Sequence, residues 1–366
     1  MNNNVEKFSD HQYFIEREGL LTDNLNNILE RVSPLFEELR GQRIFITGGT
    51  GFFGCWLLES FTFANKKLGL GASALVLTRN WEAFHKKAAH LADNPAINFL
   101  EGDVRTFSFP KGEFSYVIHA ATDASIKINE EDPLLMFDTI VQGTRRVLDL
   151  SRICRAKKLL LVSSGAVYCK QPPQLSHIPE DYTGGPDSVD HSSAYGEGKR
   201  VAEFLCTQYG NKFGIETKIA RCFAFVGPYL PLNTHYAVGN FIRDGLKGGP
   251  IHIKGDGTPY RSYLYAADLA VWLWTILFRG KPGTAYNVGS ENALTIAELA
   301  RIIANAFANE LKIIIDKKAD ERMPPERYVP LTEKVRNELG LRQEIDLENA
   351  ITRTIQWCRQ SHIHSE

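Results

Sequence analysis

The chain has no excess of charge of either sign, since 42 basic residues stand against 43 acidic ones among 366. Proteins that bind nucleic acid or an anionic membrane surface usually carry a basic excess, so neither partner is expected. No apolar run reaches the length that crosses a membrane, and the polar segment 1–10 lacks the apolar core of a signal peptide. These absences predict a cytoplasmic protein.

Cysteine is scarce and scattered. The six cysteines form no Cys-x-x-Cys pair, so no structural metal site is expected. Reduced, buried thiols fit a cytoplasmic enzyme. The chain also has no repeats and no low-complexity tract, and its length allows one large domain or two closely joined ones.

A glycine-rich turn lies between an apolar run and a helical segment. Residues 43–47 predict a strand, glycines follow at 48, 51 and 54, and residues 55–64 predict a helix. Gly48 allows a tight turn, Gly51 lets a pyrophosphate approach the backbone, and Gly54 lets the helix pack closely on the strand. The helix N-terminus then offers unpaired N–H groups to phosphates. This pattern predicts a dinucleotide-binding site.

Strands and helices alternate along most of the chain, which favours an α/β fold with a doubly wound parallel sheet, the Rossmann architecture. The apolar face of residues 20–29 predicts that an N-terminal helix packs against this body. We predict a helical N-terminal extension over 1–40 and a NAD(P)-binding Rossmann domain over 41–226. Residues 227–366 are expected to form mostly a smaller interleaved α/β substrate-binding cap, with segments that return to the Rossmann domain.

A serine, a tyrosine and a lysine form the candidate catalytic group. Ser164 ends a predicted buried strand, at the sheet edge where ligands bind, and Tyr195 and Lys199 share one helix face. A phenol with an ordinary pKa of about 10 becomes a useful base when an ammonium and a cationic nicotinamide favour its phenolate. We expect Tyr195 to take a proton from a sugar hydroxyl while Ser164 holds the same oxygen. A surface Tyr–Lys pair is the alternative.

These motifs, in this order, resemble the extended short-chain dehydrogenase/reductase family, specifically its NAD(P)-dependent nucleotide-sugar epimerase and dehydratase branch. The resemblance covers about residues 42–358. It is carried by TGGTGFFG at 47–54, GDV at 102–104, HAA at 119–121, SSGAVY at 163–168, YGEGK at 195–199, residues 221–228, GDG at 255–257 with Arg261, and YNVG at 286–289.

The resemblance implies roles for further residues. Asp103 and Val104 would contact the adenine, Ala120 and Ala121 the pyrophosphate and ribose, and Lys199 also the nicotinamide ribose. Arg261 and Arg327 would bind the substrate's diphosphate and nucleotide, with a surface salt bridge as the alternative for each. The full implied cofactor site consists of Gly48, Thr50, Gly51, Phe52, Phe53, Gly54, Thr78, Arg79, Asp103, Val104, Ala120, Ala121, Tyr195 and Lys199.

The end of the second predicted strand bears on the choice of cofactor. Residues 77–80 contain no acid that would bind both ribose hydroxyls of NAD. Arg79 is able to pair with a 2′-phosphate, and family members with a similar segment often use NADP. The cofactor is therefore expected to be NAD or NADP, with NADP slightly favoured, unless Arg79 stacks on the adenine or faces solvent.

One departure from the family narrows the reaction. The 4,6-dehydratases carry Asp-Glu where this chain has Gly165-Ala166, and the related decarboxylases of uronic acid nucleotides carry a Glu that is also missing. Without these carboxyls, elimination of water has no evident acid or base. We expect an enzyme that transiently oxidises C4 of a nucleotide hexose through a 4-keto intermediate, with 4-epimerisation as the first hypothesis. A 4-keto-sugar reductase, a 4,6-dehydratase and a dinucleotide-sensing protein without catalysis are the alternatives.

The resemblance further implies a homodimer and a role in making a surface polysaccharide or a glycosylated metabolite. The dimer would form through helices that begin near Pro133 and Tyr195. The candidate contacts are Val141, Val147, Leu148, Val201, Phe204 and Leu205.

Overall fold

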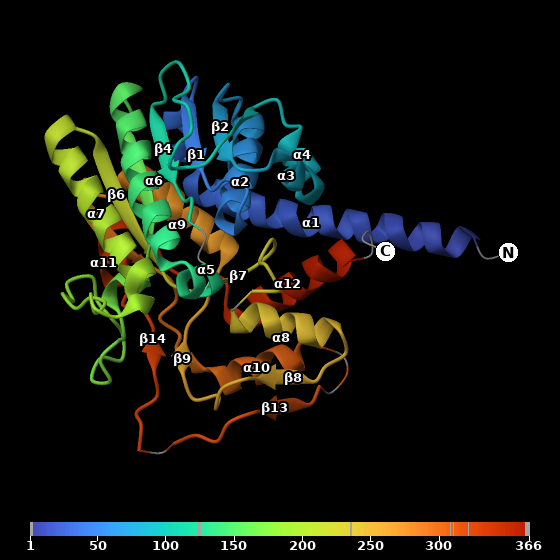
Figure 1. Ribbon diagram of the computed structural model, residues 1–366. Helices are drawn as coiled ribbons and strands as arrows, with labels where there is room; N and C mark the ends of the chain where they lie inside the picture. Colours follow the sequence, from blue (N-terminus) through green and yellow to red (C-terminus); the bar gives the residue numbers. More distant parts are fainter. Residues whose placement is uncertain are drawn as a thin grey trace.

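A computed structural model describes residues 3–122, 126–234, 236–307, 309, 311–320 and 322–362. Its centre is a parallel sheet of seven strands in the order β11-β6-β5-β4-β1-β2-β3 (Figure 1). The predicted doubly wound α/β fold is confirmed. The strands of this sheet are β1 (Arg43–Thr47), β2 (Ser73–Thr78), β3 (Ile97–Glu101), β4 (Tyr116–His119), β5 (Lys158–Ser164), β6 (Glu216–Cys222) and β11 (Thr284–Val288).

Helices cover both faces of the sheet, because the strands are apolar on both sides. On β1, Ile44 and Ile46 point into one core and Phe45 into the other. The helices α6 (Pro133–Ile153) and α7 (Ala194–Phe213) cover the face of Phe45, whereas α2 (Phe52–Leu68) and α9 (Ala266–Arg279) cover the opposite face. The short helices α3 (Trp81–Lys87), α4 (Ala89–Ala92) and α5 (Ile126–Glu131) lie in the connections.

The N-terminal segment forms a long helix, α1 (Asn3–Phe36), followed by the short 3₁₀ helix η1 (Glu37–Leu39). The C-terminal half of α1 lies against the body (Figure 1). Leu25 and Ile28 are buried in the core shared with α2 and α9. Arg31 forms an ion pair of 2.5 Å with the fully buried Asp268 of α9. This helix is therefore fastened to the sheet-flanking layer by both apolar and ionic contacts.

The smaller part of the molecule lies beyond the carboxyl ends of the sheet strands, at the bottom of Figure 1. Its short strands form three separate small sheets: β7 with β10, β8 with β13, and β12-β9-β14. The chain returns from it to the main body through α9 and β11. Its elements are β7 (Phe225–Val226), α8 (Ala237–Leu246), β8 (Ile251–Ile253), β9 (Tyr260–Arg261), β10 (Leu264–Tyr265), β12 (Leu294–Thr295), α10 (Ile296–Asn305), β13 (Ile313–Ile315), β14 (Arg327–Tyr328) and α12 (Leu347–His362). The helix α11 (Glu333–Leu339) packs against β11 and α9 of the main body instead.

Among the described residues, none of the helices combines the length and the apolar character needed to cross a bilayer.

Candidate active site

The glycine-rich turn lies where the strand order of the sheet reverses. The carboxyl ends of β1 and β4 are neighbours there, and open α/β sheets bind ligands at such a point. Gly48 has a φ of +72°, and a Cβ on it would lie 2.5 Å from the carbonyl carbon of Ala120. A Cβ on Gly54 would overlap the backbone of Gly48 and Gly49. Glycine at these two positions is thus what lets the turn close against β4 and α2.

The same turn presents the start of α2 to the ligand side. Thr50, Phe52 and Phe53 are partly exposed and Gly51 is exposed, so this surface is accessible. The first N–H groups of a helix have no partner within it, and they favour an anion. The backbone carbonyl of Thr50 accepts a hydrogen bond of 3.0 Å from the Lys87 ammonium, which steadies the turn. The turn therefore fits the pyrophosphate of a dinucleotide.

His119, at the end of β4, forms hydrogen bonds that stabilise the segment of Ala120 and Ala121. Its ring nitrogens lie 2.7 Å from the Thr47 hydroxyl and 3.1 Å from the Thr144 hydroxyl. Thr47 also accepts from the backbone N–H of Ala121 at 3.2 Å. Strands β1 and β4 and helix α6 are thereby joined under Ala120 and Ala121, the two residues expected to line the cofactor. The sequence analysis used His119 only as part of a motif.

The burial of His119 predicts a pH dependence of stability. Burial, with the Lys199 charge as a smaller cause, lowers the pKa of His119 from 6.5 to about 3. Between these two pH values the unfolded chain therefore binds more protons than the folded chain. The free energy of unfolding decreases as the pH is lowered through that range. We expect a loss of about 2 kcal/mol between about pH 7 and pH 5 from this group. Denaturant unfolding of the parent and of His119→Asn should show this slope only in the parent.

An exposed histidine supplies the control. His252 is exposed on β8, so His252→Asn should leave the slope unchanged. Equal slopes in the parent and in His119→Asn would contradict the prediction.

The residues expected to bind the adenosine end of the cofactor lie at the ends of β2 and β3. Thr78 is buried and Arg79 is exposed. The Asp103 carboxylate accepts two hydrogen bonds of 2.9 Å from the Arg105 guanidinium, which holds the pKa of Asp103 below its ordinary value. Val104 is buried where Gly143 of α6 leaves room for it. The role of these four residues at the adenosine end of the site stays a prediction, and Asp103 already has a partner.

The three candidate catalytic residues lie together. Ser164 ends β5 and its side chain is hydrogen-bonded to that of Tyr195 on α7. The Lys199 ammonium is 5.8 Å from the centroid of the Tyr195 ring. Lys199 is buried and donates to the Thr122 hydroxyl at 2.8 Å and to the Val162 carbonyl at 2.9 Å. Their catalytic roles remain predictions, but their proximity matches what those roles need.

A residue outside the predicted set fixes the start of α7. The side chain of Asn129 on α5 accepts from the backbone N–H of Tyr195 at 3.0 Å and donates to the carbonyl of Ser192 at 2.9 Å. It therefore holds the first turn of the helix that carries Tyr195. A single asparagine has no sequence pattern that would have pointed to this contact.

Burial governs the titration of the catalytic group. Burial raises the pKa of Tyr195, and the hydrogen bond with Ser164 acts in the opposite direction. Burial lowers the pKa of Lys199 to about 8. The phenol is therefore protonated in this structure at neutral pH, and the expected phenolate requires a further positive charge beside it, such as that of an oxidised nicotinamide.

The two predicted substrate arginines lie on neighbouring short strands. Arg261 on β9 forms a salt bridge of 2.8 Å with Glu326, and its carbon Cζ is 5.9 Å from the Tyr328 ring centroid. Arg327 on β14 stacks over the Tyr260 ring at 4.0 Å. Both guanidinium groups thus have partners in this structure, and Arg261 has the salt bridge that the sequence analysis kept as its alternative.

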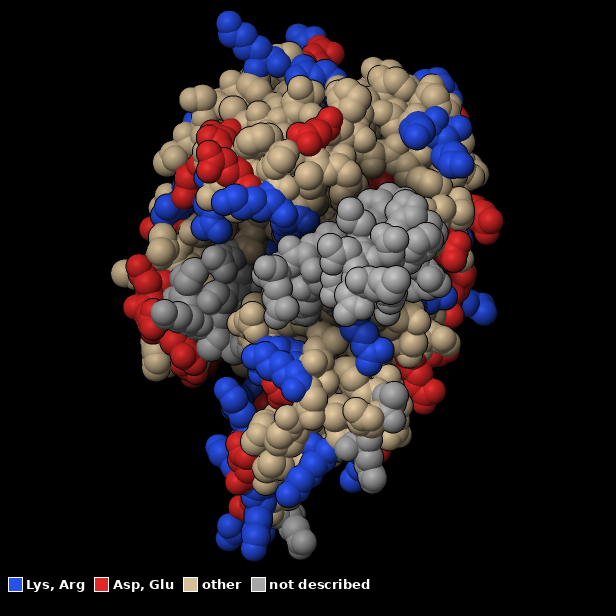
Figure 2. Space-filling view, turned by 90° about the vertical axis from the view of Figure 1, so that its right-hand side faces the viewer, with Lys and Arg blue, Asp and Glu red and all other residues tan. Residues whose placement is uncertain are grey.

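Figure 2 shows a group of Lys and Arg side chains on the larger part of the molecule, along the upper edge of a hollow, with Asp and Glu side chains beside it. Cationic side chains at the edge of a hollow raise the local concentration of anionic ligands.

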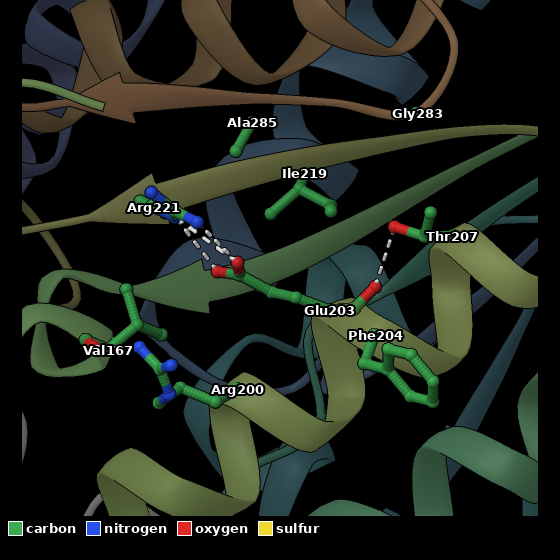
Figure 3. Close-up of a pocket in the computed structure, with 9 residues that line it drawn as sticks. All are labelled: Val167, Arg200, Glu203, Phe204, Thr207, Ile219, Arg221, Gly283 and Ala285. Carbon is green, nitrogen blue, oxygen red and sulfur yellow. Dashed lines mark hydrogen bonds and ion pairs between the residues drawn. The ribbon is translucent and has the colours of Figure 1, made fainter. Parts of the chain in front are cut away.

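A separate cavity of about 300 Å³ lies on the other side of α7 (Figure 3). Phe204, which lines it, is nine residues after Tyr195 and so lies on the opposite side of the helix. Glu203 and Arg221 are paired there at 2.7 Å, and Glu203 also accepts from the Ser163 hydroxyl at 2.6 Å. This pair joins α7 to β5 and β6 next to the catalytic strand end, and the sequence analysis did not find it.

Comparison with known proteins gives a family and two kinds of relatives. The model of the NAD dependent epimerase/dehydratase family matches residues 44–289. The chain is 29% identical over 313 residues to UDP-glucuronic acid decarboxylase 1 of Arabidopsis thaliana, which covers 86% of this chain and 69% of the relative. It is 29% identical over 324 residues to UDP-glucuronic acid decarboxylase 1 of Danio rerio, covering 88% and 74%.

Solved structures with the same fold include a UDP-glucose 4-epimerase of Thermotoga maritima with UDP-glucose, at a TM-score of 0.72 and 22% identity, covering 87% of this chain and 99% of that one. A dTDP-glucose 4,6-dehydratase of Streptomyces venezuelae with bound NAD has a TM-score of 0.72 and 22% identity, covering 87% and 98%. WbmF of Bordetella bronchiseptica, with NAD⁺ and UDP, has a TM-score of 0.71 and 22% identity, covering 89% and 95%.

Proposed function

We propose that this chain, which belongs to the NAD-dependent epimerase/dehydratase family of nucleotide-sugar-modifying enzymes, is a 4-epimerase. It would oxidise C4 of a nucleotide hexose and return the hydride to the opposite face of the sugar. The observation that carries this proposal is the convergence of Ser164, Tyr195 and Lys199 beside Gly165-Ala166. The group supports redox chemistry at one carbon, and the two small residues supply no carboxyl for chemistry elsewhere on the sugar.

The proton steps follow from the contacts. The Tyr195 oxygen takes the proton of the C4 hydroxyl, and the Ser164 hydroxyl stabilises the negative charge that develops on that oxygen. Lys199, held by Thr122 and Val162, supplies a fixed positive charge beside the phenol. A nicotinamide bound at the glycine-rich turn would supply the acceptor for the C4 hydride and would be its donor in the return step. Tyr195 then returns the proton to the C4 oxygen, which restores the hydroxyl group with the inverted configuration at C4.

Decarboxylation of a nucleotide hexuronic acid is a second candidate, and the likeness to UDP-glucuronic acid decarboxylases favours it. Oxidation at C4 would turn such a sugar into a β-keto acid. When CO₂ leaves C5, the 4-keto group accepts the electron pair, so this bond breaks without a carboxylate base. The same three residues therefore suffice for the oxidation step, and Ala166 does not exclude it.

One assay separates the candidates. The purified protein is incubated with NAD⁺ and, separately, with UDP-glucose and UDP-glucuronic acid, and the products are identified by mass and by proton NMR. A product of unchanged mass with an inverted C4 supports epimerisation. A product lighter by the mass of CO₂ supports decarboxylation. Dinucleotide retained through purification is expected for a recycling enzyme, and an empty protein that binds NADPH reversibly would favour the 4-keto-sugar reductase.

We also propose that Arg79 gives the site some affinity for NADP. It is exposed at the end of β2, and its charge acts on Asp103 at the adenosine end of the site. A guanidinium pairs well with a 2′-phosphate. Arg79→Ala should weaken NADP⁺ binding about 10-fold or more and leave NAD⁺ binding within about 2-fold, as measured by calorimetry. An equal loss for both dinucleotides would contradict this role.

A homodimer through α6 and α7 is a further part of the proposal. Among the described residues, five of the nine exposed large apolar side chains lie on these two helices: Leu134, Leu135 and Ile153 on α6, and Phe204 and Phe213 on α7. Val147 and Leu148, which the sequence analysis offered as contacts, are buried against the sheet instead. The interface would therefore use the helix ends and Phe204.

Light scattering at micromolar concentration tests the dimer. The parent should have twice the mass of the chain, and Phe204→Asp, which is 61% exposed in one chain, should shift the protein toward the monomer. Met323→Asp is the control, because Met323 is 69% exposed in the smaller part of the molecule. A monomeric parent would remove the proposal.

A further inference from the structure

A second tyrosine reaches the catalytic serine from the smaller part of the molecule. Tyr328 lies on β14, with its hydroxyl next to Gly165 and placed to share a hydrogen bond with the Ser164 side chain. Its ring packs on Phe223 with a centroid distance of 4.7 Å. Ser164 therefore lies between two phenols, Tyr195 from α7 and Tyr328 from β14.

The missing side chain at residue 165 makes room for this contact. A Cβ on Gly165 would lie 2.7 Å from the Tyr328 hydroxyl and 2.8 Å from the Phe223 ring. The space that a side chain at 165 would need is thus taken by the phenol of Tyr328. The sequence analysis noted that residue 165 is not an acid. The hydroxyl of Tyr328, from a strand distant in the sequence, lies in that space instead.

A count of donors and acceptors gives the direction of these hydrogen bonds. A serine hydroxyl has one hydrogen to donate and two lone pairs to accept with. The backbone N–H of Ala166 donates to the Ser164 oxygen at 3.2 Å and occupies one lone pair. Burial raises the pKa of Tyr328 to about 12, so this phenol keeps its proton at neutral pH and is able to donate to the second lone pair.

We propose that Tyr328 is a positioning residue that donates a hydrogen bond to Ser164. The single hydrogen of the serine hydroxyl then points to the side where the Tyr195 oxygen and the reacting C4 oxygen lie. With both lone pairs occupied, Ser164 acts only as a donor toward the reacting groups. A donor stabilises the phenolate of Tyr195 and the developing alkoxide, whereas an acceptor would stabilise their protonated forms. The proposal rests on the proposed function for the identity of the C4 oxygen, but the contact between the three hydroxyls does not.

Tyr328→Phe tests the role in turnover, because it keeps the ring on Phe223 and removes only the hydroxyl. We expect kcat to fall about 10-fold, KM for the nucleotide sugar to stay within about 2-fold, and the acidic limb of the pH–rate profile to move to higher pH. In the Ser164→Ala background the same substitution should cost no further activity. Additive losses, or an unchanged pH profile, would overturn the proposal.

Two variants serve as matched tests. Gly165→Ala places a methyl group against the Tyr328 hydroxyl and should reproduce the loss of Tyr328→Phe, with little further loss when both are combined. Tyr182→Phe removes the hydroxyl of a tyrosine that packs on Tyr168 nearby and should leave kcat unchanged. Full activity in Gly165→Ala would count against the contact.

A measurement without turnover keeps the inference separate from the proposed function. With NAD⁺ bound, the ultraviolet difference between the parent and Tyr195→Phe follows the ionisation of Tyr195. The same difference taken in the Tyr328→Phe background should have its midpoint at higher pH. If no nucleotide sugar is converted but the midpoint moves, the proposed function fails and the role of Tyr328 stands. An unmoved midpoint overturns the role of Tyr328 whatever the enzyme converts.

Discussion

Replacing Tyr195 by phenylalanine is expected to lower kcat by about 10² to 10⁴, the usual contribution of a positioned general base. The Tyr195 side chain is partly buried, shares a hydrogen bond with Ser164, and its ring centroid is 5.8 Å from the Lys199 ammonium. Phenylalanine fills the same volume and keeps the helix start that Asn129 holds through the backbone. The loss should therefore appear in the transfer of hydride and proton, measured as the rate at which bound NAD⁺ is reduced by the nucleotide sugar.

The cofactor affinity of the variant serves as the control for this prediction. Binding of NAD⁺ to Tyr195→Phe should stay within about 10-fold of the parent, because the pyrophosphate contacts at Gly48 to Gly54 are untouched. A variant that binds NAD⁺ and still turns over at the parental rate would show that another group is the base. The Tyr182→Phe variant controls for the loss of any phenol in this region.

The architecture was predictable because its signals are local. Strands such as β1 and β5 are short, mostly apolar runs, and the turn after β1 needs glycine for steric reasons that can be recognised in the sequence. The break between α3 and α4 was not predictable from the sequence, since these two short helices meet at Ala88. This residue has an extended φ of −152°, which ends the first helix. Alanine favours helices, so nothing in its identity predicts the break.

The supporting contacts of the site were not predictable because they join residues far apart in the chain. Tyr328 reaches Ser164 only after β14 has paired with β9, and Glu203 meets Arg221 only after α7 has packed on the sheet. The sequence analysis placed Ser164, Tyr195 and Lys199 by motif and spacing, which are one-dimensional. It also expected a phenolate at Tyr195, whereas burial in the folded chain favours the neutral phenol until a positive charge arrives.

The N-terminal helix is expected to depend on one buried carboxylate. Asp268 on α9 is fully buried and accepts from Arg31 of α1 at 2.5 Å. Its second oxygen accepts from the backbone N–H groups of Glu344 and Ile345, each at 3.1 Å. Three segments far apart in the chain thus meet at one side chain: α1, α9 and the segment before α12.

Asp268→Ala should lower the free energy of unfolding by about 3 kcal/mol, because it removes the nearest acceptor of the Arg31 guanidinium, only 15% exposed, and leaves two backbone N–H groups without their acceptor. Arg31 keeps weaker contacts of 3.3 Å with Glu344 and with the carbonyl of Arg342. Asp320→Ala is the matched control. Its partner Arg322 is 89% exposed, so solvent screens this ion pair and the loss there should be much smaller than for Asp268→Ala.

Denaturant unfolding gives both values, and hydrogen exchange shows where the structure loosens. If the carboxylate is what fastens α1, exchange in Asp268→Ala should rise along residues 20–36 and in 343–347 before it rises in the sheet. A loss as small as that of the Asp320 control would mean that the apolar contacts of Leu25 and Ile28 hold α1 without help from the ion pair. Each mechanism thus predicts a different exchange pattern for the same substitution.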